Sequence, residues 1–274
     1  MNNLSDDLIA FLANMLCIRD FISFSAVNWR LRRLATGSYR DFTARVNMST
    51  RDPAAISLIC SAWPHIIGVT TFWIGHSQLA AIGSLKRLQK IELLECSFNK
   101  ADLQQFIRNC SATICKFTVK DITGITTDDI VDCLAQCHHL STLDLCISQP
   151  TDDSDDDEGQ WLSLRLARTL SSYSSLETLT LDGVGINDAV LACLAFSRTL
   201  KCFGFNYTTA ISDEGLELLE TCQALTRIFF TFGNSEDPNL DEMLRQLTDR
   251  ASTQRGCAFD YRRRNQVIYG ERKR

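Results

Sequence analysis

Two groups of side chains in this sequence have residue types that could do chemistry. Cys133, Cys137, His138 and His139 are of the types that ligate zinc, and the two cysteines are spaced one helical turn apart. The run Asp152–Glu158 has the composition of a calcium-binding loop, but it lacks the glycine and the glutamate at the positions that such a loop requires. The simpler interpretations are core cysteines and a solvated acidic loop.

The short motifs of common enzymes are missing from the chain. It contains no CxxC pair, no GxSxG turn, no GxxxxGK(S/T) phosphate loop and no HExxH zinc motif. Ser154 precedes a run of acidic residues, a pattern that an acid-directed kinase could modify. We therefore expect a protein that is not an enzyme and that uses neither a cofactor nor a metal ion.

Composition and charge are those of an ordinary folded protein. Of the 274 residues, 45% are hydrophobic and 22% are charged, and the formal net charge is −5. This mild acidity gives no reason to expect nucleic acid or an anionic membrane as a partner. Basic residues gather in a tail near the end, at Arg262–Arg264 and Arg272–Arg274.

The 12 cysteines are an unusually large number for a chain of this length. Asp6 and Asp7 stand where a secretory signal would carry positive charge, and no apolar run reaches the ~18 residues of a membrane span. We therefore expect reduced thiols and a location in the cytoplasm, with the nucleus as the alternative. The cysteines then need a role in packing.

One apolar pattern recurs along the chain and predicts the elements that must position any site. An apolar residue is followed three positions later by a second and two positions after that by a third, about every 25 residues. The six clear copies are Leu88–Ile91–Leu93, Ile114–Phe117–Val119, Leu140–Leu143–Leu145, Leu176–Leu179–Leu181, Leu200–Phe203–Phe205 and Leu225–Ile228–Phe230. Fainter copies are Ile66–Val69–Thr71 and Gly256–Phe259–Tyr261. The one long interval contains the acidic run at 151–159, which we interpret as an insertion.

Each copy continues with a polar turn and then an amphipathic helix. Ser212 is expected to cap one such helix, the segments after Ile125 and Ile186 have the same form, and Pro53 is expected at the first position of another. Alternation within each copy predicts a strand with one buried face. A strand and a helix per repeat must stack on their neighbours to bury that face. The expected fold class is therefore α/β, a solenoid with a parallel sheet on the concave side and helices on the convex side.

The pattern resembles the leucine-rich repeat, and more narrowly its cysteine-containing subtype, over about residues 42–270. That subtype places a cysteine at the end of each helix, just before the next strand. Cys110, Cys137 and Cys222 stand at this position. The resemblance gives these thiols a packing role as small, buried apolar side chains.

The first 40 residues differ from the rest, because apolar residues recur there at helical spacing with no strand pattern. Leu4–Leu12 falls without gaps on the opening of an F-box, and the segment to Leu34 follows it in register. Ser5 stands where the family usually has proline, and Trp29 lies two positions before the family's usual tryptophan. The resemblance implies a three-helix F-box at 1–40, followed by leucine-rich repeats at 41–274. The alternative is that these helices only cap the repeat array.

This arrangement resembles the F-box/leucine-rich-repeat proteins and implies a non-catalytic substrate-recognition subunit of a Skp–cullin–F-box ubiquitin ligase. The F-box would bind a Skp-family adaptor and, through it, a cullin, while the repeats would bind an unidentified target, the chain being a monomer within the complex. The implied adaptor-binding residues are Leu4, Leu8, Ile9, Leu12, Leu16, Phe21 and Phe24. The competing hypothesis is a repeat scaffold without a role in ubiquitin transfer.

The residues that alternate with the buried anchors predict the target-binding face. They are Glu92, Thr118, Lys120, Asp144, Thr180, Asp182, Asn206 and Phe229. No single charge dominates this set, so the sequence does not indicate a strongly acidic or strongly basic target. Phe229 is the expected aromatic anchor, and its alternative role is packing beneath the C-terminal end of the array.

Overall fold

The computed structural model describes residues 45–48, 53–62, 64, 66–146, 164–182, 186–206, 211–231, 259–264 and 267–272. The chain divides into two compact units, Met1–Ile125 and Thr126–Arg274, which we call unit 1 and unit 2. The predicted F-box helices at 1–40 and the acidic insertion at 151–159 lie outside the described residues.

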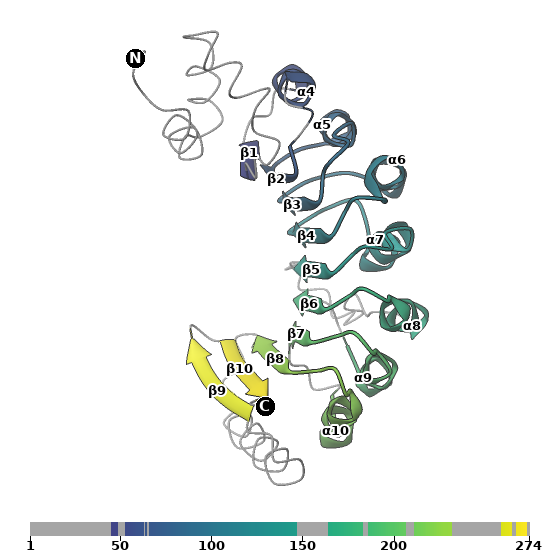
Figure 1. Cartoon of the computed structure of the whole chain (residues 1–274), viewed down its shortest axis with the longest axis vertical. Coiled ribbons are helices and arrows are strands. Elements are labelled where there is room, and N and C mark those ends of the chain that lie inside the picture. The colour runs from purple at the N-terminus through teal and green to yellow at the C-terminus, as the bar shows by residue number, and fades with distance from the viewer. Residues whose placement is uncertain are drawn as a thin grey trace, which may run out of the picture. The chain divides into compact units, whose positions relative to one another are not determined.

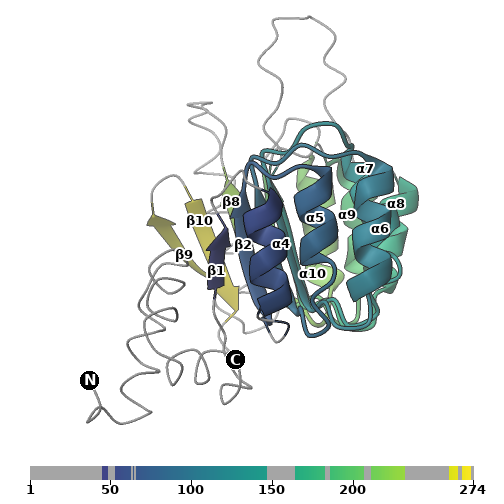
Figure 2. The ribbon, with the colours of Figure 1, turned by 90° about the horizontal axis from the view of Figure 1, so that it is seen from above.

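Unit 1 alternates strands and helices in the predicted order (Figure 1). Its elements are β1 (Arg45–Met48), α4 (Pro53–Ala62), β2 (Gly68–Phe72), α5 (His76–Ile82), β3 (Lys90–Leu94), α6 (Lys100–Cys110) and β4 (Lys116–Lys120). Each strand pairs in parallel with the next one in sequence. The helices lie side by side in one layer against one face of the strands, as Figure 2 shows from above. The opposite face of the strands is not covered by these helices.

Unit 2 repeats the same plan and then departs from it. Its elements are α7 (Thr127–Leu134), β5 (Thr142–Cys146), α8 (Leu164–Ser172), β6 (Thr178–Asp182), α9 (Asp188–Ala195), β7 (Cys202–Asn206), α10 (Asp213–Thr221), β8 (Arg227–Thr231), β9 (Phe259–Arg264) and β10 (Val267–Arg272). Strands β5 to β8 are parallel, whereas β10 pairs antiparallel with both β8 and β9. The fainter copy at Gly256–Phe259–Tyr261 is therefore not a further repeat, because its strand belongs to an antiparallel hairpin.

The predicted anchors form the core of both units. In β3, β4, β5 and β6 the second and third anchors of each copy are buried, while the residues between them lie on the other face. The anchors of neighbouring copies are register partners, for example Ile91 with Phe117 and Leu179 with Phe203. The sequence prediction of an α/β leucine-rich-repeat fold is thus confirmed for the described repeats.

The polar turns before the helices cap them as predicted. The Ser212 hydroxyl accepts a hydrogen bond from the Gly215 N–H at 3.1 Å, and Thr126 and Asn187 do the same for α7 and α9. Helix α4 begins at Pro53, whose missing N–H costs nothing in the first turn. These caps fix the residue at which each helix starts. They therefore also limit the turn that joins the helix to the strand before it.

Candidate functional site

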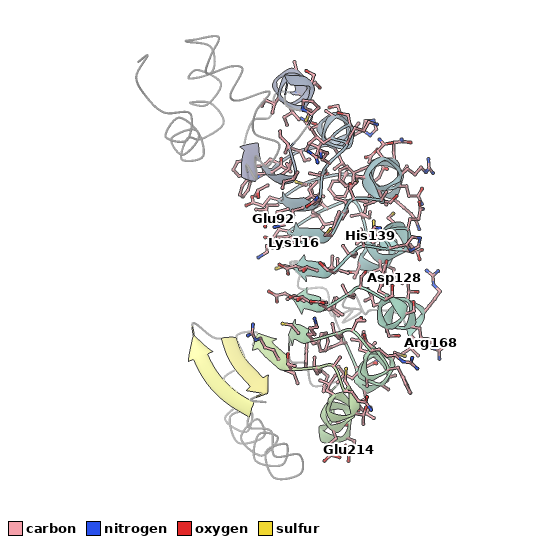
Figure 3. All side chains as sticks on the ribbon, in the orientation of Figure 1. Glu92, Lys116, Asp128, His139, Arg168 and Glu214 are labelled. Carbon is pink, nitrogen blue, oxygen red and sulfur yellow. The ribbon has the colours of Figure 1, made fainter. Side chains whose placement is uncertain are left out.

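The candidate binding surface of unit 1 is the sheet face opposite its helices, which we call the unit 1 face. Register pairs β2, β3 and β4 in three rows, so the face consists of Gly68, Lys90 and Lys116, then Thr70, Glu92 and Thr118, then Phe72, Leu94 and Lys120. Figure 3 shows Glu92 and Lys116 on this side of the strands. The sequence had predicted Glu92, Thr118 and Lys120 for a target-binding face, and the structure brings all three together here.

The carboxylate of Glu92 is already neutralised within the face. Thr70 donates its hydroxyl hydrogen to Glu92 Oε2 at 3.0 Å, and Lys116 Nζ lies 3.4 Å from Oε1. The three residues come from three neighbouring strands, and the parallel register of these strands brings their side chains together. Glu92 therefore positions its neighbours and leaves no free negative charge for a basic target.

Thr118 carries a side chain of the face that the structure buries. Its side chain is 3% exposed, and Oγ1 has no hydrogen-bond partner among the described residues. A buried hydroxyl without a partner costs about 1–3 kcal/mol of stability. The sequence signal for Thr118 was only its outward parity, and parity does not reveal that neighbouring side chains cover it.

Removing that hydroxyl should therefore not destabilise the protein. We expect Thr118→Val, measured by urea unfolding, to leave stability unchanged or to raise it by about 1 kcal/mol. The matched control is Thr113→Val, because Thr113 Oγ1 donates to the carbonyls of Leu88 at 2.6 Å and Cys110 at 3.1 Å. This control should lose about 1–2 kcal/mol. Equal losses in the two variants would show that the Thr118 hydroxyl has a partner.

Two lysines of the unit 1 face carry uncompensated charge. Lys90 and Lys120 are exposed, and neither ammonium group has an ion-pair partner within the part of the chain that the structure describes. Lys116 differs from them because it is paired with Glu92. Within this face the unpaired charge is thus positive, although the sequence shows it as mixed.

Aromatic and aliphatic side chains lie at the Lys120 end of this face. Phe72 and Leu94 are half-buried register partners in the row that ends at Lys120. Trp73 follows Phe72, is 47% exposed, and donates its indole N–H to Glu95 Oε2 at 2.7 Å. We call Phe72, Trp73 and Leu94 the apolar corner. The sequence prediction had not singled out Phe72 or Trp73, because their copy of the repeat is faint.

The apolar corner is held by a repeated backbone turn at the ends of the strands. Trp73, Glu95 and Asp121 each follow the last residue of a strand and have φ of 54°, 52° and 52°. Bulky residues rarely adopt this left-handed conformation. The Trp73 N–H donates to the Leu94 carbonyl, and the Glu95 N–H donates to the Lys120 carbonyl. The hydrogen-bonded ladder therefore continues past the strands and fixes where Trp73 emerges.

Unit 2 presents a more polar face, which includes two carboxylates. Asp144, Thr180 and Asp182 are half-buried on β5 and β6, as their alternation predicted. The Cys146 thiol donates to Asp182 Oδ2 at 3.4 Å. Asn206 and Phe229 are in β7 and β8, but their side chains lie outside the described residues, so the predicted aromatic anchor stays a prediction.

The Cys–His group does not converge on a common point. Cys133 and Cys137 are buried in unit 2, whereas His138 and His139 are exposed. Burial, together with a smaller contribution from the neighbouring Cys133, raises the pKa of the Cys137 thiol to about 12. Within the described residues, no group of three or more His, Cys, Asp or Glu side chains could hold a metal ion.

The cysteines at helix ends are core residues, as the repeat resemblance implied. Cys110, Cys137 and Cys222 are buried, and all ten cysteines among the described residues are free thiols. Ser197 and Tyr173 occupy the corresponding position in the two copies without cysteine, and both are buried. The Ser197 hydroxyl accepts from the Leu200 N–H at 3.3 Å, which makes a polar side chain tolerable there.

Cys137 tests this packing role. Cys137→Ser should lower the free energy of unfolding by about 1–3 kcal/mol, because the new hydroxyl enters a buried site. The Leu140 N–H is already donated to the Cys137 carbonyl, so it cannot serve that hydroxyl as fully as Leu200 serves Ser197. Cys193→Ser is the control, since Cys193 is only half-buried. Urea unfolding of both variants measures the difference, and equal stability would contradict a core role for Cys137.

Three hydroxyl side chains that the sequence prediction missed join one repeat to the previous one. Thr113, Ser175 and Thr199 each directly precede the first anchor of a copy. Each donates to carbonyl groups of the preceding repeat: Thr113 to Leu88, Ser175 to His138 and Leu140, and Thr199 to Tyr173 and Leu176. A serine or threonine immediately before the anchor was the sequence signal that could have revealed them.

A small cavity lies on the helix side of unit 2. It has a volume of about 210 Å³ and is lined by Ala135, His138, Thr169, Ser172, Tyr173 and Ser174. Pockets for drug-sized ligands usually measure about 300–1,000 Å³ and are mostly apolar. The size and polar lining of this cavity do not favour a small-molecule site.

The seven predicted adaptor-binding residues, Leu4 to Phe24, lie outside the described residues. No helix among the described residues combines the length and hydrophobicity needed to span a membrane.

Comparisons with known proteins were made at three levels. No protein-family model matches the sequence, and no curated protein is similar to it. Among solved structures, the chain is similar to one in the complex of Rad7 and Elc1 from yeast, with 14% sequence identity and a TM-score of 0.36. That similarity covers 89% of this chain and 85% of the other. The proposal below therefore rests on the sequence arrangement and on the geometry of the repeats.

Proposed function

We propose that this chain is the substrate-recognition subunit of a Skp–cullin–F-box ubiquitin ligase. The observation that carries the proposal is an F-box-like segment, Leu4–Leu34, followed directly by cysteine-containing leucine-rich repeats. The repeat half of this arrangement has the expected fold, with buried cysteines at the ends of its helices. The sheet face opposite the helices then serves as the surface that holds the target.

In this role the chain needs no catalytic residue of its own. Binding a target and an adaptor at once raises the effective concentration of the target near the ubiquitin-transfer machinery. We propose the cytoplasm or the nucleus as its location, where its thiols stay reduced.

A second candidate is a repeat scaffold that binds proteins without an adaptor. It is favoured by the two departures from the F-box pattern, Ser5 and Trp29. In this alternative the N-terminal segment caps the first repeat and buries its apolar residues there.

Co-purification with an adaptor separates the two candidates. The full chain is co-expressed with a tagged Skp-family adaptor, and the complex is isolated on the tag and then by size exclusion. The substrate-receptor proposal expects one stable complex, which also binds the amino-terminal part of a cullin when that fragment is added. A chain that elutes alone, folded and without adaptor, would favour the scaffold.

A further inference from the structure

We propose that the unit 1 face binds an extended acidic segment of the target protein that carries one large apolar residue. This inference deepens the proposed function, because it takes the sheet face as the surface that holds the target. The apolar residue would pack against the apolar corner of Phe72, Trp73 and Leu94. Carboxylates of the same segment would pair with Lys120 and Lys90.

Charge complementarity selects an acidic partner. The only carboxylate among the nine residues of the unit 1 face, that of Glu92, is bonded to Thr70 and Lys116. Lys90 and Lys120 remain exposed, with no ion-pair partner in the described part of the chain. An acidic segment would meet two free cations, whereas a basic segment would be repelled at the same places. The carboxylate of Glu95, at the edge of the face, accepts the Trp73 indole N–H.

The apolar corner favours a protein segment over a ligand that offers only negative charge. Trp73 is 47% exposed, yet its indole N–H is already bonded to Glu95, so the ring presents an apolar surface held in place. Interfaces concentrate their binding energy in such aromatic residues. Half-buried Phe72 and Leu94 extend this surface up to Lys120.

The strand register also sets the spacing that the segment should have. Leu94 and Lys120 are register partners, so an apolar residue and its first carboxylate would be near neighbours. Lys90 is at the other end of β3 from Leu94, about 13 Å away at the rise of a strand. An extended peptide covers that distance in about four residues. A second carboxylate is therefore expected about four positions from the apolar residue.

Selection from a displayed library of random peptides of about twelve residues tests this proposal. The purified full chain is immobilised without adaptor, and the enriched consensus peptide is synthesised with a fluorophore for anisotropy measurements. We expect acidic consensus peptides with one large apolar residue and a carboxylate about four positions from it. Affinity should fall as salt is raised.

Matched variants locate the binding. Lys120→Glu and Leu94→Ser should each weaken the consensus peptide about tenfold or more. The controls Arg168→Glu and Leu164→Ser make the same changes at exposed positions of α8, on the helix side, and should leave affinity unchanged (Figure 3). Circular dichroism and urea unfolding of all four variants verify that they fold.

Several results would overturn the proposal. These are a basic consensus, no consensus, equal effects of Lys120→Glu and Arg168→Glu, or equally tight binding of a single-stranded oligonucleotide of similar charge. Because the peptide measurement contains no adaptor, its result is independent of adaptor binding. Loss of adaptor co-purification with peptide binding intact would reject the ubiquitin-ligase role alone.

Discussion

Under the proposed substrate-receptor role, replacing Leu8 and Leu12 together by aspartate should abolish co-purification of the chain with a Skp-family adaptor. The two leucines are four positions apart in the F-box-like segment, so in the helix that the sequence predicts two charges would enter the same apolar stripe. A charge buried in an apolar interface without a partner is strongly unfavourable. The repeats should keep their fold, because their core is built from other residues. Pull-down on the tagged adaptor measures the loss, and far-ultraviolet circular dichroism follows the fold.

A second double variant controls for the added charge. Leu164 and Phe196 are 42% and 83% exposed on the helix side of unit 2, and Leu164→Asp with Phe196→Asp introduces the same two charges there. We expect this variant to co-purify with the adaptor as the unchanged chain does. Undiminished adaptor binding by the Leu8 and Leu12 variant would reject the F-box interpretation. A shared loss in both variants would point to charge or solubility instead of docking.

Gly215→Ala should destabilise the protein by about 3 kcal/mol, although alanine usually stabilises a helix relative to glycine by about 1 kcal/mol. A Cβ at this position in α10 would lie 1.8 Å from Asp188 Oδ1. Asp188 cannot move freely, because it accepts hydrogen bonds from the Ser212 N–H at 2.9 Å and the Ser212 hydroxyl at 2.7 Å. Ser212 in turn caps α10. The added methyl therefore breaks the connection between α9 and the cap of α10.

A double-mutant cycle isolates this clash. Asp188→Ala alone loses the two hydrogen bonds to Ser212, and adding Gly215→Ala to it should then cost little, because the carboxylate is gone. Urea unfolding of the single and double variants gives the coupling free energy. Additive losses would mean that Gly215 is needed for some reason other than the approach of Asp188.

The repeat fold was predictable because each copy of the pattern has to bury the same alternating apolar residues. Leu143 and Leu145 alternate with polar residues, and the copy at Leu179 and Leu181 does so in register, so parallel pairing buries both sets. Capping at Ser212 was predictable too, since a hydroxyl ahead of two acidic residues is a local signal. Neither inference depends on which residues are neighbours across the sheet.

The binding surface was predictable only in part, because its properties arise between strands. Their alternation with the buried anchors placed Glu92 and Lys120 on the unit 1 face. The sequence could not show that Lys116 and Thr70, each more than twenty residues from Glu92, neutralise its charge. It also could not show that Thr118 is covered. The hairpin of β9 and β10 was misread for a similar reason, since alternation gives a strand but not its direction.

The side-chain bonds of Thr113, Ser175 and Thr199 bear on how an array of this kind can change its length in evolution. Each donor belongs to the residue just before an anchor, and each acceptor is a backbone carbonyl that every repeat possesses. A carbonyl does not distinguish which repeat supplies its donor. Gain or loss of one whole period therefore leaves the same bond at the new junction, and the long interval before Ser175 shows that residues inserted within a repeat also leave the bond in place. Such an array can lengthen by complete repeats, or within one repeat, without losing these bonds.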